Sequence, residues 1–185
     1  MPTYVLMTGL PGVGKTTLAN ALAARLKGIV LNKDTVRAAL FPGSLTDYSL
    51  EQDTLCFNAV LEAAGYLARR KRAEYLFLDG RTFSKRAQIE QAIAAATNEN
   101  CAWRILQLVC TDEIAERRLI ESSRSHPALN RTAELYRQVK SAFEPISHPK
   151  LVIDTSRPQE DCLREAAAYL TEEGRERGGS GEVLR

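Results

Sequence analysis

The stretch that decides the fold is Gly9-Leu10-Pro11-Gly12-Val13-Gly14-Lys15-Thr16, close to the N-terminus. It matches the pattern G-x-x-x-x-G-K-[ST] at every fixed position. Glycines there let backbone N–H groups turn inward around a phosphate, and a helix that follows adds the positive end of its dipole. The stretch comes directly after an apolar run at residues 4–7 and opens a helical pattern. The sequence therefore predicts a phosphate-binding loop between a strand and a helix.

Short apolar runs alternate with longer helical patterns along the rest of the chain. The runs are residues 4–7, 29–31, 75–78, 105–109 and 151–153, and none alternates cleanly between apolar and polar residues. Such runs are typical of a parallel sheet that is covered on both faces. The helical patterns are residues 15–27, 35–40, 50–72, 85–96, 112–122, 131–143 and 159–170. Because strand–helix–strand units form right-handed crossovers, we expect an open α/β sheet.

Length and composition favour one globular domain. The chain has 185 residues, of which 44% are hydrophobic and 26% charged, and its net charge is +2. We expect a domain over residues 1–173 and a disordered tail over 174–185, because residues 174–181 contain four glycines and no apolar anchor. The small net charge gives no general field for nucleic acid, and no apolar run approaches the length of about 18 residues of a membrane span. Four cysteines without a C-x-x-C pair favour a reduced, cytoplasmic protein.

The loop residues have distinct expected roles. Lys15 should reach the β- and γ-phosphates of a bound nucleotide, and the Thr16 hydroxyl should bind Mg²⁺. Thr17 is the next donor, near the α-phosphate. The other nucleotide-binding positions should surround the phosphates with backbone: Gly9, Leu10, Pro11, Gly12, Val13 and Gly14.

Neighbouring motifs exclude two classes of nucleotide-binding protein. Asn32-Lys33-Asp34 lacks the spacer of the guanine-reading N-K-x-D motif and follows the second strand, which argues against a GTPase. The sequence contains no L-S-G-G-Q signature of a transporter ATPase. A small P-loop kinase or a close relative remains.

The chain resembles the P-loop "predicted kinase" family, which is related to polynucleotide 5′-kinase, adenylylsulfate kinase and the zeta-toxin group. The resemblance spans residues 3–170 and rests on residues 9–17, Asp34-Thr-Val-Arg37, Leu78-Asp-Gly-Arg-Thr-Phe-Ser84 and an arginine-rich stretch at 117–131. It implies a three-layer P-loop NTPase fold whose five parallel strands have the order 2-3-1-4-5. It also implies ligands at the carboxyl ends of the strands and a small arginine-rich lid near residues 122–131.

Asp34 and Arg37 are the candidate acceptor-site pair. They lie three residues apart at a helix start, so both should face the same side. In the polynucleotide kinase relatives this pair combines a base for the accepting hydroxyl with an arginine that holds the acceptor's phosphate. A carboxylate can take the hydroxyl proton, and a guanidinium can bind a phosphate through two hydrogen bonds. The alternative is a helix-capping Asp34 with a surface Arg37.

Asp79 and Arg81 follow the third apolar run. A carboxylate at the end of such a strand can hold water on the Mg²⁺ that Thr16 binds, which assigns Asp79 to the metal. The alternative is a turn residue, since Asp-Gly favours tight turns. Arg81 lies at the same edge and is expected to bind the acceptor or a phosphate.

The arginine-rich stretch is the candidate lid. Arg117 and Arg124 resemble the pair of small kinases in which one arginine stacks on adenine and the other clamps phosphate. This assigns Arg117 to the nucleotide and Arg124 to catalysis, whereas the alternative for each is a solvated basic helix end. The resemblance also implies that residues 154–158 hold the adenine.

Together these features predict an ATP- and Mg²⁺-dependent kinase that transfers the γ-phosphate to a hydroxyl of an acceptor, with a small molecule favoured. Two alternatives stay open. One is a polynucleotide 5′-hydroxyl kinase, which needs a basic groove. The other is a nucleotide-binding switch that acts through a partner protein.

Overall fold

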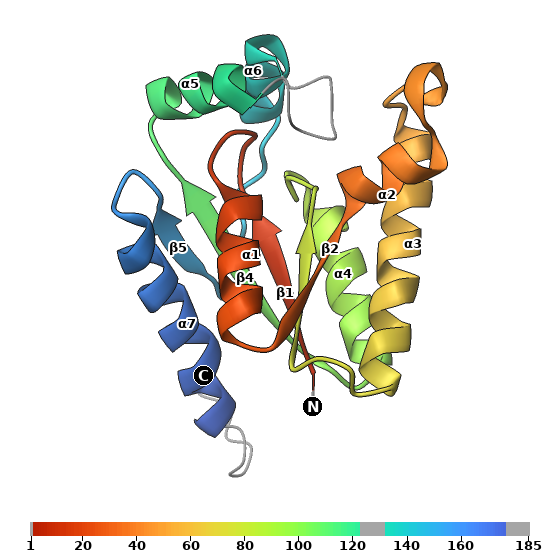
Figure 1. Cartoon of the computed structure of the whole chain (residues 1–185), viewed down its shortest axis with the longest axis vertical. Coiled ribbons are helices and arrows are strands. Elements are labelled where there is room, and N and C mark those ends of the chain that lie inside the picture. The colour runs from red at the N-terminus through yellow and green to blue at the C-terminus, as the bar shows by residue number, and fades with distance from the viewer. Residues whose placement is uncertain (1, 123–131, 177–185) are drawn as a thin grey trace.

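One parallel sheet organises the computed structural model, which describes residues 2–122 and 132–176. Its order is β2-β3-β1-β4-β5, as the family resemblance implies (Figure 1). The strands are β1 (Thr3–Thr8), β2 (Gly28–Asn32), β3 (Tyr75–Asp79), β4 (Ala102–Val109) and β5 (Leu151–Asp154). All neighbours pair in parallel, so the five carboxyl ends meet at one edge of the sheet. The predicted fold class is confirmed.

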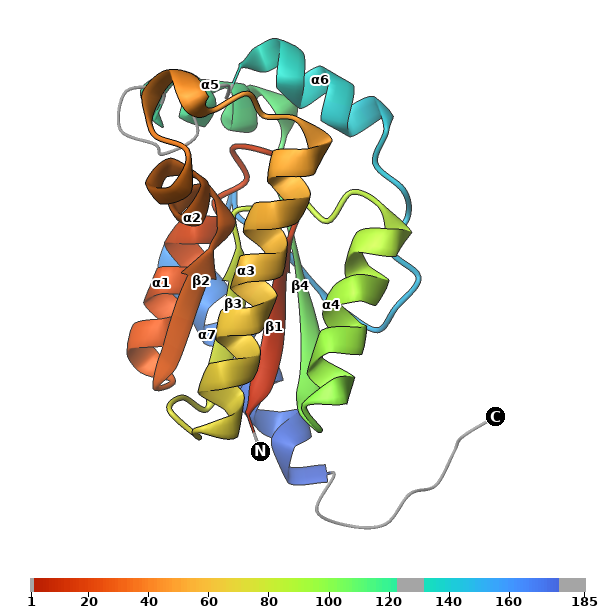
Figure 2. The ribbon, with the colours of Figure 1, turned by 90° about the vertical axis from the view of Figure 1, so that its right-hand side faces the viewer.

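Helices cover both faces of the sheet, which gives the three layers. On one face lie α1 (Lys15–Arg25) and α7 (Gln159–Glu176), and on the other lie α3 (Leu50–Arg69) and α4 (Arg86–Asn98) (Figure 2). Helix α2 (Lys33–Leu40), the 3₁₀ turn η1 (Gly43–Leu45), α5 (Asp112–Ser122) and α6 (Ala133–Ser141) lie at the carboxyl edge (Figure 1). Among the described helices, none has both the length and the apolar composition to cross a membrane.

The central strand β1 is buried on both sides. Tyr4 and Leu6 pack into the cluster with α3 and α4, whereas Val5 and Met7 pack into the cluster with α1 and α7. All four side chains are fully buried. A strand between two apolar layers has no solvent face, which explains why the sequence shows no apolar–polar alternation.

Two element boundaries differ from the prediction for a physical reason. Helix α2 begins at Lys33 rather than residue 35, because the Asn32 side chain accepts hydrogen bonds from the backbone N–H groups of Asp34 and Thr35 and caps the helix. Strand β4 begins at Ala102 rather than residue 105, because its first residues pair with β1 although Arg104 interrupts the apolar run.

Helix ends also differ. Helix α4 begins at Arg86 rather than residue 85, and the Glu144 carboxylate accepts from the Arg86 N–H at 2.8 Å. Helix α7 continues to Glu176, so residues 174–176 of the predicted disordered tail are helical. The rest of that tail, and lid residues 123–131 with Arg124, lie outside the described residues.

Gly80 allows helix α2 to approach the end of β3. Its φ is +78°, and a Cβ there would lie 2.7 Å from Asn32 Oδ1 and 2.8 Å from the backbone nitrogens of Lys33 and Asp34. Two of these three contacts are backbone atoms, which cannot move aside without shifting the helix. The glycine that follows Asp79 therefore sets the position of α2 at the carboxyl edge.

We predict that Gly80→Ala lowers the free energy of unfolding by about 2–3 kcal/mol, because strain at positive φ adds to backbone contacts. Gly43→Ala is the matched control, since Gly43 also has positive φ (+60°) but nothing lies within 4 Å of the added Cβ. The control should lose about 1 kcal/mol through backbone strain alone. Urea unfolding measures both; equal losses would show that α2 does not depend on Gly80.

Candidate active site

The phosphate loop is held by left-handed glycines and by its own lysine. Gly9, Gly12 and Gly14 have φ values of +131°, +81° and +89°. A Cβ on Gly12 would lie 2.5 Å from the Ala115 carbonyl oxygen, so α5 packs closely on the loop. Lys15 Nζ donates to the carbonyl oxygens of Gly9 and Leu10, each at 2.8 Å. The ammonium therefore lies over the loop, where a phosphate would meet it.

The loop forms one wall of a cleft of about 930 Å³ at the carboxyl edge. The loop residues that line it are Pro11, Gly12, Gly14, Lys15, Thr16 and Thr17. The other three predicted positions do not line it: Gly9 and Leu10 supply carbonyl oxygens to Lys15, and Val13 is a core residue.

Asp79 joins the two halves of the cleft. One carboxylate oxygen, Oδ2, accepts from Thr16 Oγ1 and from Asn32 Nδ2, both at 2.7 Å. The side chain is buried, and Oδ1 has no hydrogen-bond partner among the described residues. A buried carboxylate oxygen with unused acceptor capacity beside a threonine hydroxyl fits the oxygen ligands that Mg²⁺ requires. Thr16 and Asp79, which the sequence assigns to one metal ion, therefore lie together, and their binding of Mg²⁺ stays a prediction.

Asn32 is a site residue that the sequence did not reveal, because it matters through contacts to residues far along the chain. Its amide nitrogen binds Asp79, and its amide oxygen caps α2. Since Asn32 supplies the cap, the capping alternative for Asp34 does not hold. The sequence signal that could have identified Asn32 as the cap was an asparagine directly before a helical pattern.

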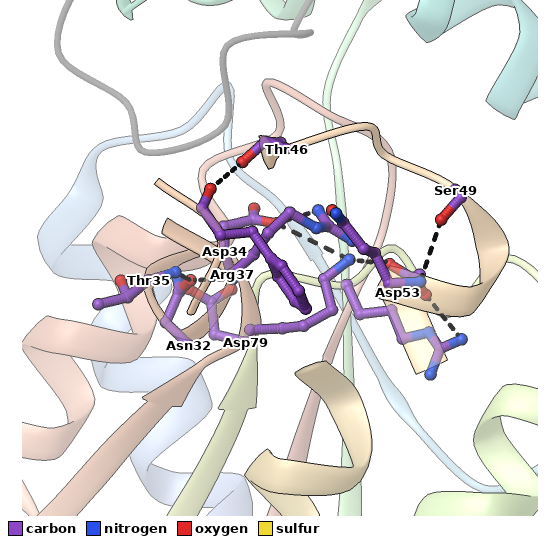
Figure 3. Close-up of polar contacts among 12 residues, drawn as sticks. Asn32, Asp34, Thr35, Arg37, Thr46, Ser49, Asp53 and Asp79 are labelled. Carbon is purple, nitrogen blue, oxygen red and sulfur yellow. Dashed lines mark hydrogen bonds and ion pairs between the residues drawn. The ribbon is translucent and has the colours of Figure 1, made fainter. Parts of the chain in front are cut away.

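Three cations of the same cleft surround Asp53, and Figure 3 shows this carboxylate near Arg37. Asp53 Oδ1 accepts from Arg37 Nη2 at 2.8 Å and pairs with Lys33 Nζ, and Oδ2 pairs with Arg81 Nη2 at 2.9 Å. Each cationic side chain is 7% exposed, whereas that of Asp53 is 21% exposed. The predicted acceptor-site residues Arg37 and Arg81 are thus brought together by a carboxylate from α3.

The electrostatics keep Asp53 ionised. Burial would raise its pKa, but the charge and hydrogen bond of Lys33 and the charge of Arg81 outweigh burial, and the pKa of Asp53 lies below its ordinary 3.8. Burial lowers the pKa of Arg81, and the Asp53 charge opposes that shift.

Aromatic rings support the two arginines. The guanidinium carbon of Arg81 lies 4.4 Å from the centre of the Phe57 ring, and that of Arg37 lies 5.2 Å from the Tyr48 ring. This cluster could not be predicted from the sequence, because Asp53 looks like an ordinary acidic residue in the first turn of a helix.

Asp34 lines the same cleft as Lys15 and Thr16. Its carboxylate lies 3.4 Å from Arg37 Nη1 and 3.7 Å from Lys33 Nζ, and its side chain is 14% exposed. The expected sharing of one helix face by Asp34 and Arg37 is therefore present. The cleft brings together a phosphate loop and a carboxylate that can accept a proton.

On the far side of the loop, the structure places Arg118 rather than Arg117 at the cleft. Arg117 is exposed and does not line it. Arg118 donates to Thr155 Oγ1 at 3.0 Å and to the Thr155 carbonyl at 2.9 Å, and the Thr155 hydroxyl donates to the Val13 carbonyl at 2.9 Å. Thr155 and Arg157, from the loop expected to hold adenine, line the cleft too. The assignment of Arg117 to the nucleotide stays a prediction, and Arg118 is the neighbouring arginine that lines the cleft.

Residues 5–146 match the model of a family described as an AAA domain. The chain belongs to this family. The match includes the phosphate loop, Asp34, Asp79 and Arg118, and it confirms the resemblance to P-loop kinases. Among curated proteins, no match reaches significance.

Solved structures share the fold of this family member at low sequence identity. The APS kinase of Mycobacterium tuberculosis, solved with AMPPNP and APS, is 18% identical with a TM-score of 0.68, and the alignment covers 91% of this chain and 96% of that one. A sugar kinase from Janibacter is 17% identical (TM-score 0.67, 92% and 95% covered). A gluconokinase from Sinorhizobium meliloti is 18% identical (TM-score 0.64, 96% and 98% covered). At these identities the likeness establishes the P-loop fold.

We predict that Arg118→Ala weakens nucleotide binding by about tenfold, because the variant loses charge-assisted hydrogen bonds that link α5 to Thr155 beside the phosphate loop. Arg117→Ala, one residue away and exposed, is the matched control and should bind as wild type does. Calorimetric titration with AMPPNP measures both affinities. A larger loss in the Arg117 variant would restore the sequence-based assignment.

Proposed function

We propose that the protein is an ATP- and Mg²⁺-dependent kinase that transfers the γ-phosphate to a hydroxyl of a small molecule. One observation carries the proposal: the phosphate loop and Asp34 line a single cleft. Phosphoryl transfer depends mainly on positioning a donor phosphate and an acceptor in line and on stabilising charge. A cleft that contains both a phosphate loop and a candidate base suits this reaction. A nucleotide-binding switch would need only the phosphate loop.

The side chains of the cleft would have distinct roles in this reaction. Lys15 would bind the β- and γ-phosphates, and Arg118 and Thr155 would contact the nucleoside side. Asp34 would accept the proton of the attacking hydroxyl, because it is the carboxylate of α2 that lines the cleft. Arg37 and Arg81 would hold the acceptor. The role of Arg124 at the γ-phosphate stays a prediction.

Magnesium would be held by the Thr16 hydroxyl and, directly or through water, by Asp79. When bound, the ion supplies positive charge that neutralises the phosphates. The hydrogen bonds of Asp79 to Thr16 and Asn32 fix the orientation of the carboxylate beforehand.

The distribution of charge favours a small acceptor over a polynucleotide. The densest basic run of the sequence is Arg69-Arg70-Lys71-Arg72, at the end of α3. Asp53 lies in the first turn of this 20-residue helix, beside the cleft, so the basic run lies about 25–30 Å away along the helix axis. The cleft volume of about 930 Å³ is within the usual range for small-molecule sites.

The donor side is tested by Lys15→Ala. Loss of the ammonium should weaken ATP binding by about tenfold or more, because a charge-assisted contact to phosphate disappears. The side chain is only partly buried and donates hydrogen bonds to carbonyl oxygens of the loop itself, so the melting temperature should stay near wild type. Calorimetry gives the affinity, and unchanged binding in a folded variant would refute the phosphate loop.

The acceptor side is tested by Asp34→Asn. Asn32 still caps α2 in this variant, so the fold and ATP binding should persist. Transfer should fall by about 100-fold or more, because an amide cannot accept the hydroxyl proton. The measurement is transfer from labelled ATP to an acceptor found by screening hydroxyl-bearing metabolites, with oligonucleotides included in the screen. Wild-type transfer rates in the variant would remove Asp34 from catalysis.

A further inference from the structure

Asp53 is the central carboxylate of the acceptor side, and the proposed reaction gives it no role. Both of its oxygens are engaged: Oδ1 by Lys33 and Arg37, and Oδ2 by Arg81. Sites that bind a phosphate, sulfate or carboxylate group of a ligand commonly direct several cations at its oxygens in this way. In the ligand-free protein, a side chain of the protein itself fills this position.

The cations have more hydrogen-bonding capacity than Asp53 uses. Arg37 Nε and both Nε and Nη1 of Arg81 are buried and have no hydrogen-bond partner among the described residues. The two arginines are 5% and 7% exposed, and both line the cleft. Charged donors that are buried without partners are costly, so the cluster is incompletely satisfied by Asp53. A larger oxyanion, with three or four oxygens, would satisfy it better.

The charges of the cluster also favour an anion that replaces Asp53. Lys33, Arg37 and Arg81 carry three positive charges, and Asp34 and Asp53 carry two negative ones. An anion that entered while Asp53 stayed in place would be repelled by it at close range. An anion that replaced Asp53 would meet three cations and one remaining carboxylate, Asp34.

The side chain of Asp53 is placed so that it can leave. It is three times as exposed as the cations that it binds, and it lines the cleft as they do. Asp53 lies in the first turn of α3, whose cap is the Ser49 hydroxyl bound to the Gln52 N–H. Rotation of the Asp53 side chain into the cleft would therefore leave the start of the helix intact.

We infer that Asp53 is an internal counter-anion that determines acceptor specificity: an oxyanion of the acceptor displaces it from Lys33, Arg37 and Arg81. The inference rests on the proposed function, since it concerns the acceptor in the same cleft. A neutral acceptor leaves Asp53 bound to the cations and gains nothing from them. An acceptor that carries a phosphate, sulfate or carboxylate group replaces one anion with another and is selected.

The test uses inorganic sulfate as the probe and AMPPNP with Mg²⁺ to occupy the phosphate loop. Binding of AMPPNP is titrated first, and its absence would contradict the proposed function before sulfate is added. Sulfate is then titrated by calorimetry into wild type and Asp53→Asn. The variant should bind sulfate at least about tenfold more tightly, because the competing charge is gone. Normal AMPPNP binding with no gain in sulfate affinity would overturn the inference alone.

Two further variants test where the sulfate binds. Asp47→Asn is the matched control, because Asp47 is exposed in the loop before α3, its carboxylate accepts from the Ser49 N–H, and it does not line the cleft. It should bind sulfate as wild type does. In the double variant Asp53→Asn/Arg81→Gln the gain should disappear; if it persists, sulfate binds elsewhere and the inference fails.

A crystal structure of the wild-type AMPPNP complex, grown from ammonium sulfate, tests displacement without relying on the stability of a variant. Sulfate should lie between Arg37 and Arg81, with the Asp53 carboxylate turned into the cleft. A structure in which Asp53 still bridges the three cations at molar sulfate would overturn the inference.

Discussion

The hydrogen bonds of one buried carboxylate hold the site together. Asp79, at the carboxyl end of β3, accepts from Thr16 in the first turn of α1 and from Asn32 at the start of α2. These three elements come from separate crossovers of the sheet, and each carries a different part of the site. A buried acceptor that is satisfied by both neighbours fixes their relative positions more firmly than exposed contacts would.

Gly80 completes this junction by steric means. Because it has no side chain, the backbone of α2 can pass directly over the end of β3. Helix α2 then presents Lys33, Asp34 and Arg37 to the cleft that Lys15 also lines. The position of these three side chains therefore depends on a hydrogen bond and a close backbone approach, both of which involve the Asp79-Gly80 pair.

The cluster of Lys33, Arg37 and Arg81 around Asp53 is an example of buried charge that is balanced within the protein. Three buried cations would repel one another without Asp53, and Phe57 and Tyr48 add favourable ring contacts to the two arginines. Such a cluster contributes little net stability, because desolvation offsets much of the attraction. Its value lies in holding a fixed set of donors at the cleft before a ligand arrives.

The sequence by itself determined the fold class, the phosphate loop and the Thr16–Asp79 pairing. These depend on local patterns: apolar runs that report burial on both faces, and a glycine-rich motif whose backbone conformation is encoded by adjacent residues. The strand order came from the family resemblance that those motifs carried. Asp34 and Arg37 could be placed on one face because they are one helical turn apart.

Only the tertiary structure decided which distant residues meet. Asp53 is 20 residues from Lys33 and 28 from Arg81 in the sequence, and no spacing rule links them; the packing of α3 beside α2 does. Arg117 and Arg118 are adjacent and chemically identical, and the rotation of α5 about its axis turns the second toward Thr155 and leaves the first exposed. Contacts of this kind depend on how helices pack against the sheet, a property that local sequence does not contain.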